Sequence, residues 1–173
     1  RQVSLYLHMI NDFEQIGDHA ACIAHMSNEM NENKTQFSEE AWDELNVVME
    51  AVREEINTTC KAFLENDKEL SQRVAPLGMV ITTLCDELKI RHVERMSNGA
   101  CGLEEGTVYS DILNSFTRIS KNSEEPVDIH IHNSRVYPSD TKEYKTYLAE
   151  YSQKYELIKI EEHIRSMEPE EVE

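Results

Sequence analysis

Glu14 and Asp18 are the two residues whose type and spacing most directly suggest chemistry. They lie in the stretch 6–22, YLHMINDFEQIGDHAAC. On a helix they are one turn apart, so both carboxylates point the same way and repel each other unless a cation binds between them. Asn11 lies on the same polar side, and His25, two turns past Asp18, is within reach of it. Without a cation these side chains form a solvated acidic face, and the spacing alone leaves both interpretations open.

A second group of possible metal ligands is Asp128, His130 and His132, in the alternating stretch 128–137, DIHIHNSRVY. An extended backbone would bring these side chains to one face, although an unanchored loop of this kind usually binds nothing. The alternation is also typical of a strand. A lone strand has nothing to pair with, so we expect an irregular link or a short helix. No Glu stands three residues before a His, which argues against a di-iron oxidase built on a helical bundle.

The helix that carries Glu14 and Asp18 has an apolar stripe on its other side, formed by Tyr6, Met9, Phe13, Ile16, Ala20 and Ile23. Residues 109–123, YSDILNSFTRISKNS, repeat this frame. The two stretches share four residues, in the pairs Tyr6 and Tyr109, Asn11 and Asn114, Phe13 and Phe116, and Ile16 and Ile119. Thr117 and Lys121 stand where the first copy has its two acids. The repeat therefore predicts two similar helical units, of which one lacks the acids.

Helical periodicity predicts about five helices, and hence an all-α fold with the architecture of an antiparallel helical bundle. The first helix occupies residues 1 to about 33 and starts without a cap, as if the chain were cut from a larger protein. The second begins after Ser38 as N-cap and runs to about Glu65. Its apolar face is expected to hold Trp42, Leu45, Met49, Val52, Ile56 and Phe63.

The third predicted helix starts near Leu70, continues through Pro76 with a kink and stops at Gly99. The fourth occupies residues 103–124 and ends before Pro126. The last covers residues 139–166, with Ser139 or Asp140 as its cap. The whole chain, 1–173, is expected to form a single domain.

The chain of 173 residues is strongly acidic, with a formal net charge of −17. This charge argues against nucleic-acid binding, which needs clustered Lys and Arg, and against binding to anionic lipid surfaces. No apolar run approaches the roughly 20 residues of a membrane-spanning helix. The four cysteines include no Cys-x-x-Cys pair, so a thiolate zinc site is not expected, and reduced thiols suit a cytoplasmic protein.

Several of these motifs, in this order, resemble the PhoU-like domains, above all the PhoU-like domain at the C-terminus of bacterial sodium/phosphate cotransporter proteins. The resemblance rests on N-D-F-E-x-I-G-D-H-A in the first helix and N-x-F-x-R-I-S in its repeat. It extends to V-A-P-L at residues 74–77, L-K-I-R-H-V-E-R-M at residues 88–96 and Y-L-A-E-Y-S-Q-K-Y-E-L at residues 147–157. It covers residues 1 to about 160. By this likeness, residues 1–33 are the last helix of a first bundle, 38–124 a second three-helix bundle, and 139–166 a C-terminal helix.

The resemblance implies that Glu14 and Asp18 match ligands of the surface metal clusters of PhoU proteins. A divalent or ferric ion (iron, zinc or magnesium) is therefore the one cofactor that the sequence suggests, although the acids of a preceding helix are missing. The second cluster looks degenerate, unless Asp86 or Asp111 substitutes for its acids. The corresponding positions hold Ala75, Gly78, Thr82, Thr117 and Lys121, none of which offers a carboxylate.

The resemblance further implies a non-enzymatic regulatory domain that modulates phosphate transport. Its partner would be a membrane transporter domain of the same or another chain, and it would lie on the cytoplasmic side of the bacterial cell membrane. Three alternatives stay open: a free-standing PhoU-type regulator of a phosphate ABC transporter, a metal-dependent helical-bundle enzyme, and a purely structural module. Neither a glycine-rich phosphate loop nor a Ser-His-Asp grouping favours the enzyme.

The apolar stripe of the first helix predicts an assembly. By the family likeness its own bundle partners are missing, and an exposed stripe of this length would be an unusually large apolar patch. We expect two copies of the chain to pair through this helix as a homodimer, against the repulsion of their net charge.

Overall fold

The computed structural model describes residues 2–127 and 141–156. This part of the chain is built from helices and contains no strand, which confirms the predicted all-α helical bundle. The helices are α1 (Gln2–Asn33), α2 (Glu39–Glu65), the single turn α3 (Lys68–Ser71), α4 (Val74–Ser97), α5 (Leu103–Val127) and α6 (Lys142–Lys154). In the described ranges, no helix combines the length and the apolar character that crossing a membrane requires.

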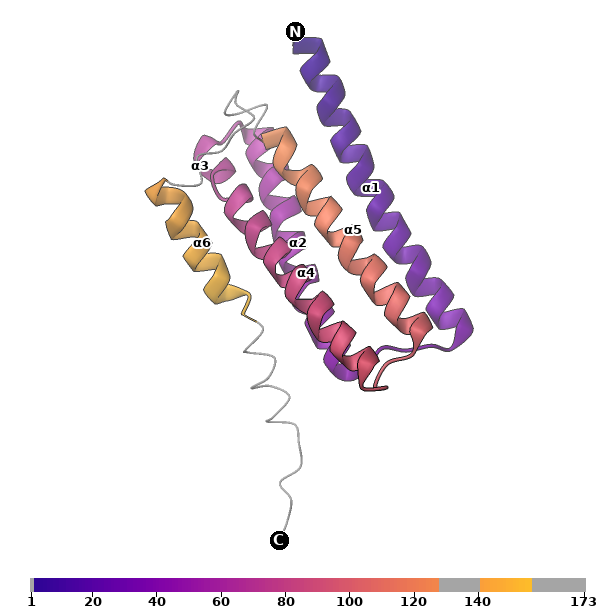
Figure 1. The fold of residues 1–173 in the computed structure, drawn as a ribbon. Helices are drawn as coiled ribbons and strands as arrows, with labels where there is room; N and C mark the ends of the chain where they lie inside the picture. Colours follow the sequence, from indigo (N-terminus) through magenta and orange to yellow (C-terminus); the bar gives the residue numbers. More distant parts are fainter. Residues whose placement is uncertain (1, 128–140, 157–173) are drawn as a thin grey trace.

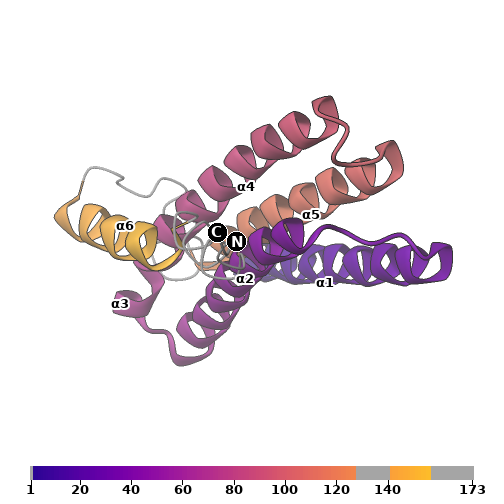
Figure 2. The ribbon, with the colours of Figure 1, turned by 90° about the horizontal axis from the view of Figure 1, so that it is seen from below.

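Three long helices, α2, α4 and α5, pack against one another around the main core. Helix α1 lies along the outer side of α5, and α6 lies against α4 on the opposite flank (Figures 1 and 2). The polar contacts between α1 and α5 show that the two helices are antiparallel. Asn33 near the end of α1 bonds Glu104 near the start of α5, whereas Gln15 bonds Asn122 near the end of α5.

Helix α1 covers the core with part of its predicted stripe. Of that stripe, Met9 is buried, Phe13, Ile16 and Ile23 are half-buried, and Tyr6 and Ala20 are exposed. Beyond the stripe, Met26 and Met30 are buried in the main core. The N-terminal end of α1 projects past the ends of α2 and α5 (Figure 1). Part of the stripe is therefore covered within one chain, which weakens the reason for the predicted homodimer. The homodimer itself stays a prediction.

Helix α2 begins and ends where the sequence predicted. The Ser38 hydroxyl accepts a hydrogen bond from the Ala41 amide at 3.2 Å, and Asn66 closes the helix in the left-handed conformation at φ 52°. The predicted apolar face of α2 is confirmed in part, because Leu45 and Val52 are buried in the main core. Trp42 is 45% exposed and Met49 is exposed as well, whereas two acids of α2 lie inside the bundle. The buried positions are Ala41, Glu44, Leu45, Val48, Ala51, Val52, Glu55, Thr59 and Ala62.

The predicted kinked helix through Pro76 is instead two helices. The single turn α3 is capped by the Asp67 carboxylate, which accepts from the amides of Glu69 and Leu70. The chain then turns at residues 72–73, and α4 starts at Val74. Pro76 thus falls in the first turn of α4, where its missing N–H removes no helical hydrogen bond.

The end of α4 follows the prediction, because Gly99 has a φ of 72° and the Ala100 amide reaches back to the Arg95 carbonyl at 2.9 Å. Helix α5 runs on to Val127, so Pro126 lies in its last turn instead of after it. Helix α6 is capped by Thr141, whose hydroxyl accepts from the Tyr144 amide, and the predicted caps at residues 139 and 140 lie outside the described residues. The stretch 128–137 and the residues past 156 lie outside them too.

Polar contacts of tyrosines hold α6 on the bundle. Tyr155 donates a hydrogen bond to Glu54 of α2, and Lys154 pairs with the same carboxylate at 2.7 Å. The Arg73 guanidinium lies 4.4 Å from the centre of the Tyr147 ring and pairs with Glu150 at 3.2 Å.

Candidate functional site

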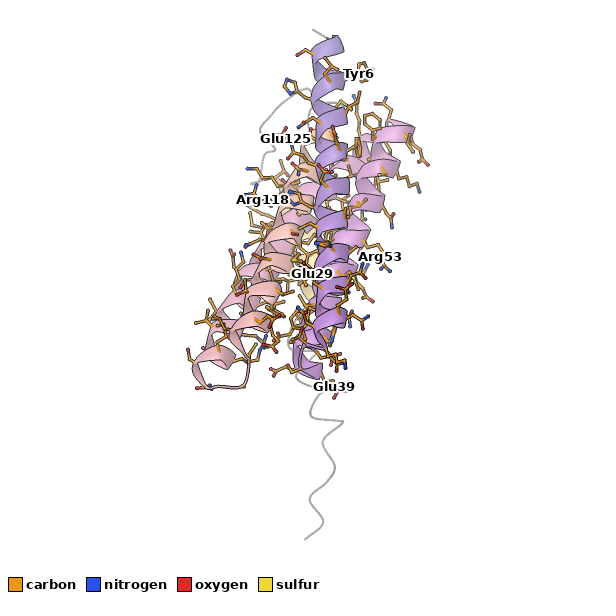
Figure 3. The ribbon with its side chains drawn as sticks, turned by 90° about the vertical axis from the view of Figure 1, so that its right-hand side faces the viewer. Tyr6, Glu29, Glu39, Arg53, Arg118 and Glu125 are labelled. Carbon is orange, nitrogen blue, oxygen red and sulfur yellow. The ribbon has the colours of Figure 1, made fainter. Side chains whose placement is uncertain are left out.

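The residues predicted to bind metal on α1 lie on its outward side. Asn11, Glu14 and Asp18 are all exposed, and His25 is exposed and pairs with Glu29 at 3.4 Å. The periodicity of the helix adds Leu7 and Ile10, both 62% exposed, to this surface, which we call the outer face of α1. Figure 3 shows α1 in front of the bundle, with this helix accessible along its length.

The outer face does not gather further metal ligands. Within residues 2–127 and 141–156, no three side chains of His, Cys, Asp or Glu come close enough to hold a metal ion. Asp128, His130 and His132 lie outside the described residues. Two neighbouring carboxylates in water bind a cation weakly, so this surface, as described, is an acidic and apolar face.

The positions of the predicted second cluster are spread over α4 and α5. Thr82 and Thr117 are half-buried, and the Thr117 hydroxyl bonds the Leu113 carbonyl of its own helix at 3.0 Å. Lys121 is exposed. Asp86 is exposed and pairs weakly with Lys89 at 3.8 Å, and Asp111 is exposed, so neither brings a carboxylate into a shared site with other acids. Gly78 is buried and faces carboxylates from two other helices.

A polar centre inside the bundle escaped the sequence analysis. Glu44 of α2 is 0% exposed, and its Oε2 accepts a hydrogen bond from Arg95 Nη2 at 2.8 Å and another from the Tyr109 hydroxyl at 2.8 Å. Arg91 approaches the other carboxylate oxygen at 3.7 Å. The motif R-H-V-E-R of α4 thus places two guanidinium groups on one buried acid. One sequence signal could have predicted this centre: Glu44 is adjacent to Leu45, a residue of the predicted apolar face, and so lies near the inward side of α2.

His92 and Tyr109 complete this centre. Their rings are stacked with centroids 4.7 Å apart, and Arg95 lies over the Tyr109 ring at 5.4 Å. Burial, together with the positive charge of Arg95, lowers the pKa of His92, whereas burial raises the pKa of the Tyr109 hydroxyl. Neutral His92 and un-ionised Tyr109 therefore pack as aromatic groups around the ion pair. The centre joins α2, α4 and α5, and its His92, Arg95 and Tyr109 line a small hollow of about 110 Å³.

A second interior acid, Glu55, lies three turns further along α2 and is also 0% exposed. Its Oε1 accepts a hydrogen bond from Ser120 Oγ of α5 at 2.9 Å, while its Oε2 has no hydrogen-bond partner. Burial, followed by the charge of Glu124, raises the pKa of Glu55 well above its usual value. A related case on α1 is Asp12, which is buried near Glu125 and His8 and whose pKa burial also raises.

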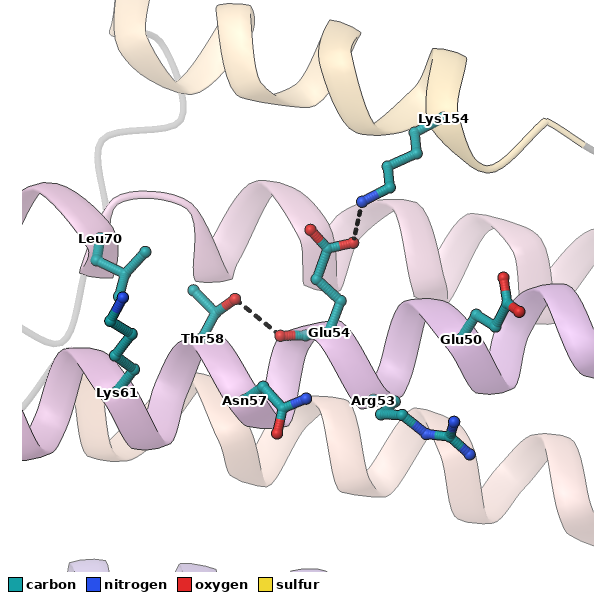
Figure 4. Close-up of a pocket in the computed structure, with 8 residues that line it drawn as sticks. All are labelled: Glu50, Arg53, Glu54, Asn57, Thr58, Lys61, Leu70 and Lys154. Atoms are coloured by element: carbon teal, nitrogen blue, oxygen red, sulfur yellow. Dashed lines mark hydrogen bonds and ion pairs between the residues drawn. The ribbon is translucent and has the colours of Figure 1, made fainter.

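The surface carries a shallow hollow of about 400 Å³ between α2, α3 and α6 (Figure 4). Both acidic and basic side chains line it. The carboxylate of Glu54 at its centre pairs with Lys154 and accepts a hydrogen bond from Tyr155. Arg53 and Asn57 point away from this pair (Figure 4). The lining residues are Glu50, Arg53, Glu54, Asn57, Thr58, Lys61, Leu70 and Lys154. Since its central acid is already paired, the hollow presents no arrangement of nucleophile and base.

A larger hollow of about 610 Å³ lies between the end of α1, the start of α2 and Ile112 of α5. Trp42, Phe37 and Met30 supply its apolar part, and amide and hydroxyl side chains supply most of the rest.

Compared with models of known protein families, with curated proteins and with solved structures, the chain matches none of them.

Proposed function

We propose that this chain is a non-enzymatic regulatory domain that modulates phosphate transport by contacting the cytoplasmic surface of a membrane transporter, as its resemblance to PhoU-like domains implies. The transporter belongs either to the same chain, as in the sodium/phosphate cotransporters, or to another chain, as for a regulator of a phosphate ABC transporter. The observation that supports this proposal is the chemistry of the outer face of α1.

The outer face combines apolar side chains with acids. Leu7 and Ile10 are exposed at its N-terminal end, and Glu14 and Asp18 follow one and two turns later. The helix Gln2–Asn33 contains neither Lys nor Arg, so nothing along it neutralises these acids apart from its histidines. An acidic face with an apolar end suits a partner that is basic and amphipathic.

The cytoplasmic loops of membrane proteins are such partners, because they carry an excess of Lys and Arg. Contact between an acidic face and a basic loop speeds association and orients the two surfaces, while the apolar residues contribute to affinity once water is excluded. A contact of this kind needs no catalytic residue, and it needs no metal ion.

The arrangement of the repeat also supports the resemblance to PhoU-like domains. Its two copies lie on α1 and α5, which run side by side and antiparallel over most of their length (Figure 1). The residues that the copies share contribute to the packing, since Tyr109, Phe116 and Ile119 are buried and Phe13 lies edge-on to Phe63 at 5.8 Å. The apolar residues of these motifs thus contribute to the packing of the helices.

The test reverses the charge of the outer face in cells whose own copy of the chain has been removed. Glu14→Lys with Asp18→Lys should abolish the control of phosphate uptake by external phosphate. Asp86→Lys with Glu94→Lys makes the same charge change on exposed positions of α4 and should leave that control intact. Uptake is followed with radioactive phosphate, and a photoreactive residue at Leu7 should crosslink to a transporter loop. Unchanged uptake and no crosslink would reject the proposed contact.

A further inference from the structure

The larger hollow, at the end of the bundle where α1 ends and α2 begins, has an unusual lining for this chain (Figure 1). The sequence contains 34 acidic residues, yet none of the residues that line this hollow of about 610 Å³ is acidic. The one charged side chain in the lining is that of Lys34. A hollow of this volume accommodates a small organic molecule, and its chemistry differs from that of the acidic outer face of α1.

Trp42 forms an aromatic wall of the hollow. Its indole ring lies edge-on to Phe37 with the ring centroids 5.5 Å apart, while 45% of the residue remains exposed. Phe37 is itself buried and packs in turn against Tyr109 at 5.6 Å, so the indole is supported from the core. Met30 and Ile112 are buried and add to the apolar lining. A supported indole that is partly open to solvent is a platform on which a flat ring can stack.

The polar lining consists mainly of uncharged groups that both donate and accept hydrogen bonds. Asn28, Asn31 and Gln36 contribute side-chain amides, and within the described part of the chain no other protein group bonds these amides. Each amide offers an acceptor and two donors, which match the ring nitrogens and amino groups of nitrogen heterocycles. Carboxylates, the strongest acceptors for the hydroxyl groups of a neutral sugar, are absent from this lining.

Lys34 stands at a position where glycine is the usual residue. It follows the last residue of α1 with a φ of 57°. The amides of Lys34 and Thr35 bond the carbonyls of Asn31 and Met30 at 3.3 Å and 3.0 Å, which is the Schellman closure of a helix and favours glycine or asparagine at the left-handed position. Backbone preference therefore does not explain the lysine. Among the described residues its ammonium group has no ion-pair partner, so it is available to an anion in the hollow.

We propose that this hollow binds a flat nitrogen heterocycle that carries an anionic group, which is the chemistry of a nucleoside monophosphate. The ring stacks on Trp42, the amides bond its edge, and Lys34 pairs with the phosphate. At physiological ionic strength the screening length is about 8 Å, so distant acids of the chain repel the phosphate only weakly. The hollow lies more than two helical turns past Asp18, so this site does not depend on the proposed contact of the outer face with a transporter.

Trp42 makes the test direct, because it is the only tryptophan of the chain. At about 0.15 M salt, AMP should quench its fluorescence with saturation. Adenosine and inorganic phosphate each lack one half of the ligand and should bind at least about fivefold more weakly in calorimetry. Lys34→Gln should weaken AMP about fivefold and leave adenosine unchanged. The matched control Lys61→Gln removes an exposed lysine from the other hollow and should leave AMP binding unchanged.

Two further variants separate binding from folding. Lys34→Gly should keep the fold in circular dichroism, because glycine adopts the left-handed conformation more readily than lysine, and should lose AMP affinity as Lys34→Gln does. Trp42→Leu should weaken AMP about tenfold or more in calorimetry, because the stacking surface is lost. The proposal is overturned if AMP does not bind the wild type, if adenosine binds as tightly as AMP, or if Lys34→Gln and Lys61→Gln weaken AMP equally. Saturable quenching by glucose but not by AMP would overturn it in favour of a sugar site.

Discussion

Removing the carboxylate of Glu44 should destabilise the bundle more than any other single loss of charge in the described interior. Its Oε2 receives two hydrogen bonds of 2.8 Å, from Arg95 and Tyr109, and the acid is 0% exposed. Arg95 is only 13% exposed, and its other acidic neighbour is Glu40, 3.8 Å away and half in solvent. An exposed pair of that kind is worth at most about 1 kcal/mol.

Glu44→Gln therefore leaves the Arg95 guanidinium without an adequate partner. Breaking a buried ion pair from one side costs about 3–5 kcal/mol, and the retained amide oxygen places Glu44→Gln near the lower end of this range. Tyr109→Phe removes one hydrogen bond to a charged group and should cost about 1.5–3 kcal/mol. Arg95→Met leaves the buried carboxylate uncompensated and should cost about as much as Glu44→Gln.

Urea unfolding of the single variants and of Glu44→Gln with Arg95→Met gives a double-mutant cycle. The double variant has no unpaired buried charge, so it should be more stable than the sum of the single losses predicts, with a coupling above about 1 kcal/mol. Additivity within about 0.5 kcal/mol would refute the reasoning, because the two groups would then act independently. Circular dichroism of each variant checks that the fold is retained.

Three further predictions concern other parts of the molecule. Metal analysis of the purified chain should find no stoichiometric iron or zinc that survives dialysis against a chelator, because no three His, Cys, Asp or Glu side chains of the described residues are placed to hold a metal ion. Metal that is retained in the wild type and lost in Glu14→Ala with Asp18→Ala would contradict this. Gly78→Ala should cost about 1–3 kcal/mol in urea unfolding, because the new carbon meets Glu124, and Glu124→Ala should relieve much of that loss. Sedimentation equilibrium tests the predicted homodimer: pairing through the apolar stripe of α1 should be weakened by Tyr6→Ser at the exposed end of that stripe, and a monomer at high concentration would show that the stripe is satisfied within one chain.

The helix boundaries that could be predicted are those set by local chemistry. Ser38 caps α2 because its hydroxyl bonds a nearby amide, and Gly99 ends α4 because only a residue without a side chain adopts its positive φ readily. Pro76 was interpreted wrongly because a proline in the first turn and a proline in the middle of a helix leave the same apolar periodicity around them. What distinguishes the two cases is the turn at residues 72–73 between α3 and α4, which makes Pro76 a first-turn residue.

The inward face of α2 was predicted only in part, in Leu45 and Val52, because it also contains acids. A periodicity that counts only apolar residues selected Trp42 and Met49, which are exposed, and passed over Glu44 and Glu55. Arg95 lies 51 residues from Glu44 in sequence, and Ser120 lies 65 residues from Glu55, so no local sequence pattern predicts these contacts. The exposure of Glu14 and Asp18 on the outer face of α1 could be predicted, because helical periodicity alone places them on the polar side of the helix.

Glu44 and Glu55 show how one helix can bury the same residue type with opposite consequences. They lie three turns apart on the same side of α2, and both are fully enclosed. The difference comes from α4, which presents the guanidinium of Arg95 to Glu44 and the bare backbone of Gly78 to the neighbourhood of Glu55. At Glu44 the negative charge is balanced within the protein, by the guanidinium of Arg95 at 2.8 Å. At Glu55 the described hydrogen bond comes from the Ser120 hydroxyl of α5, and burial together with the charge of a second acid, Glu124, raises the pKa of Glu55, whereas Arg95 stabilises the charge of Glu44.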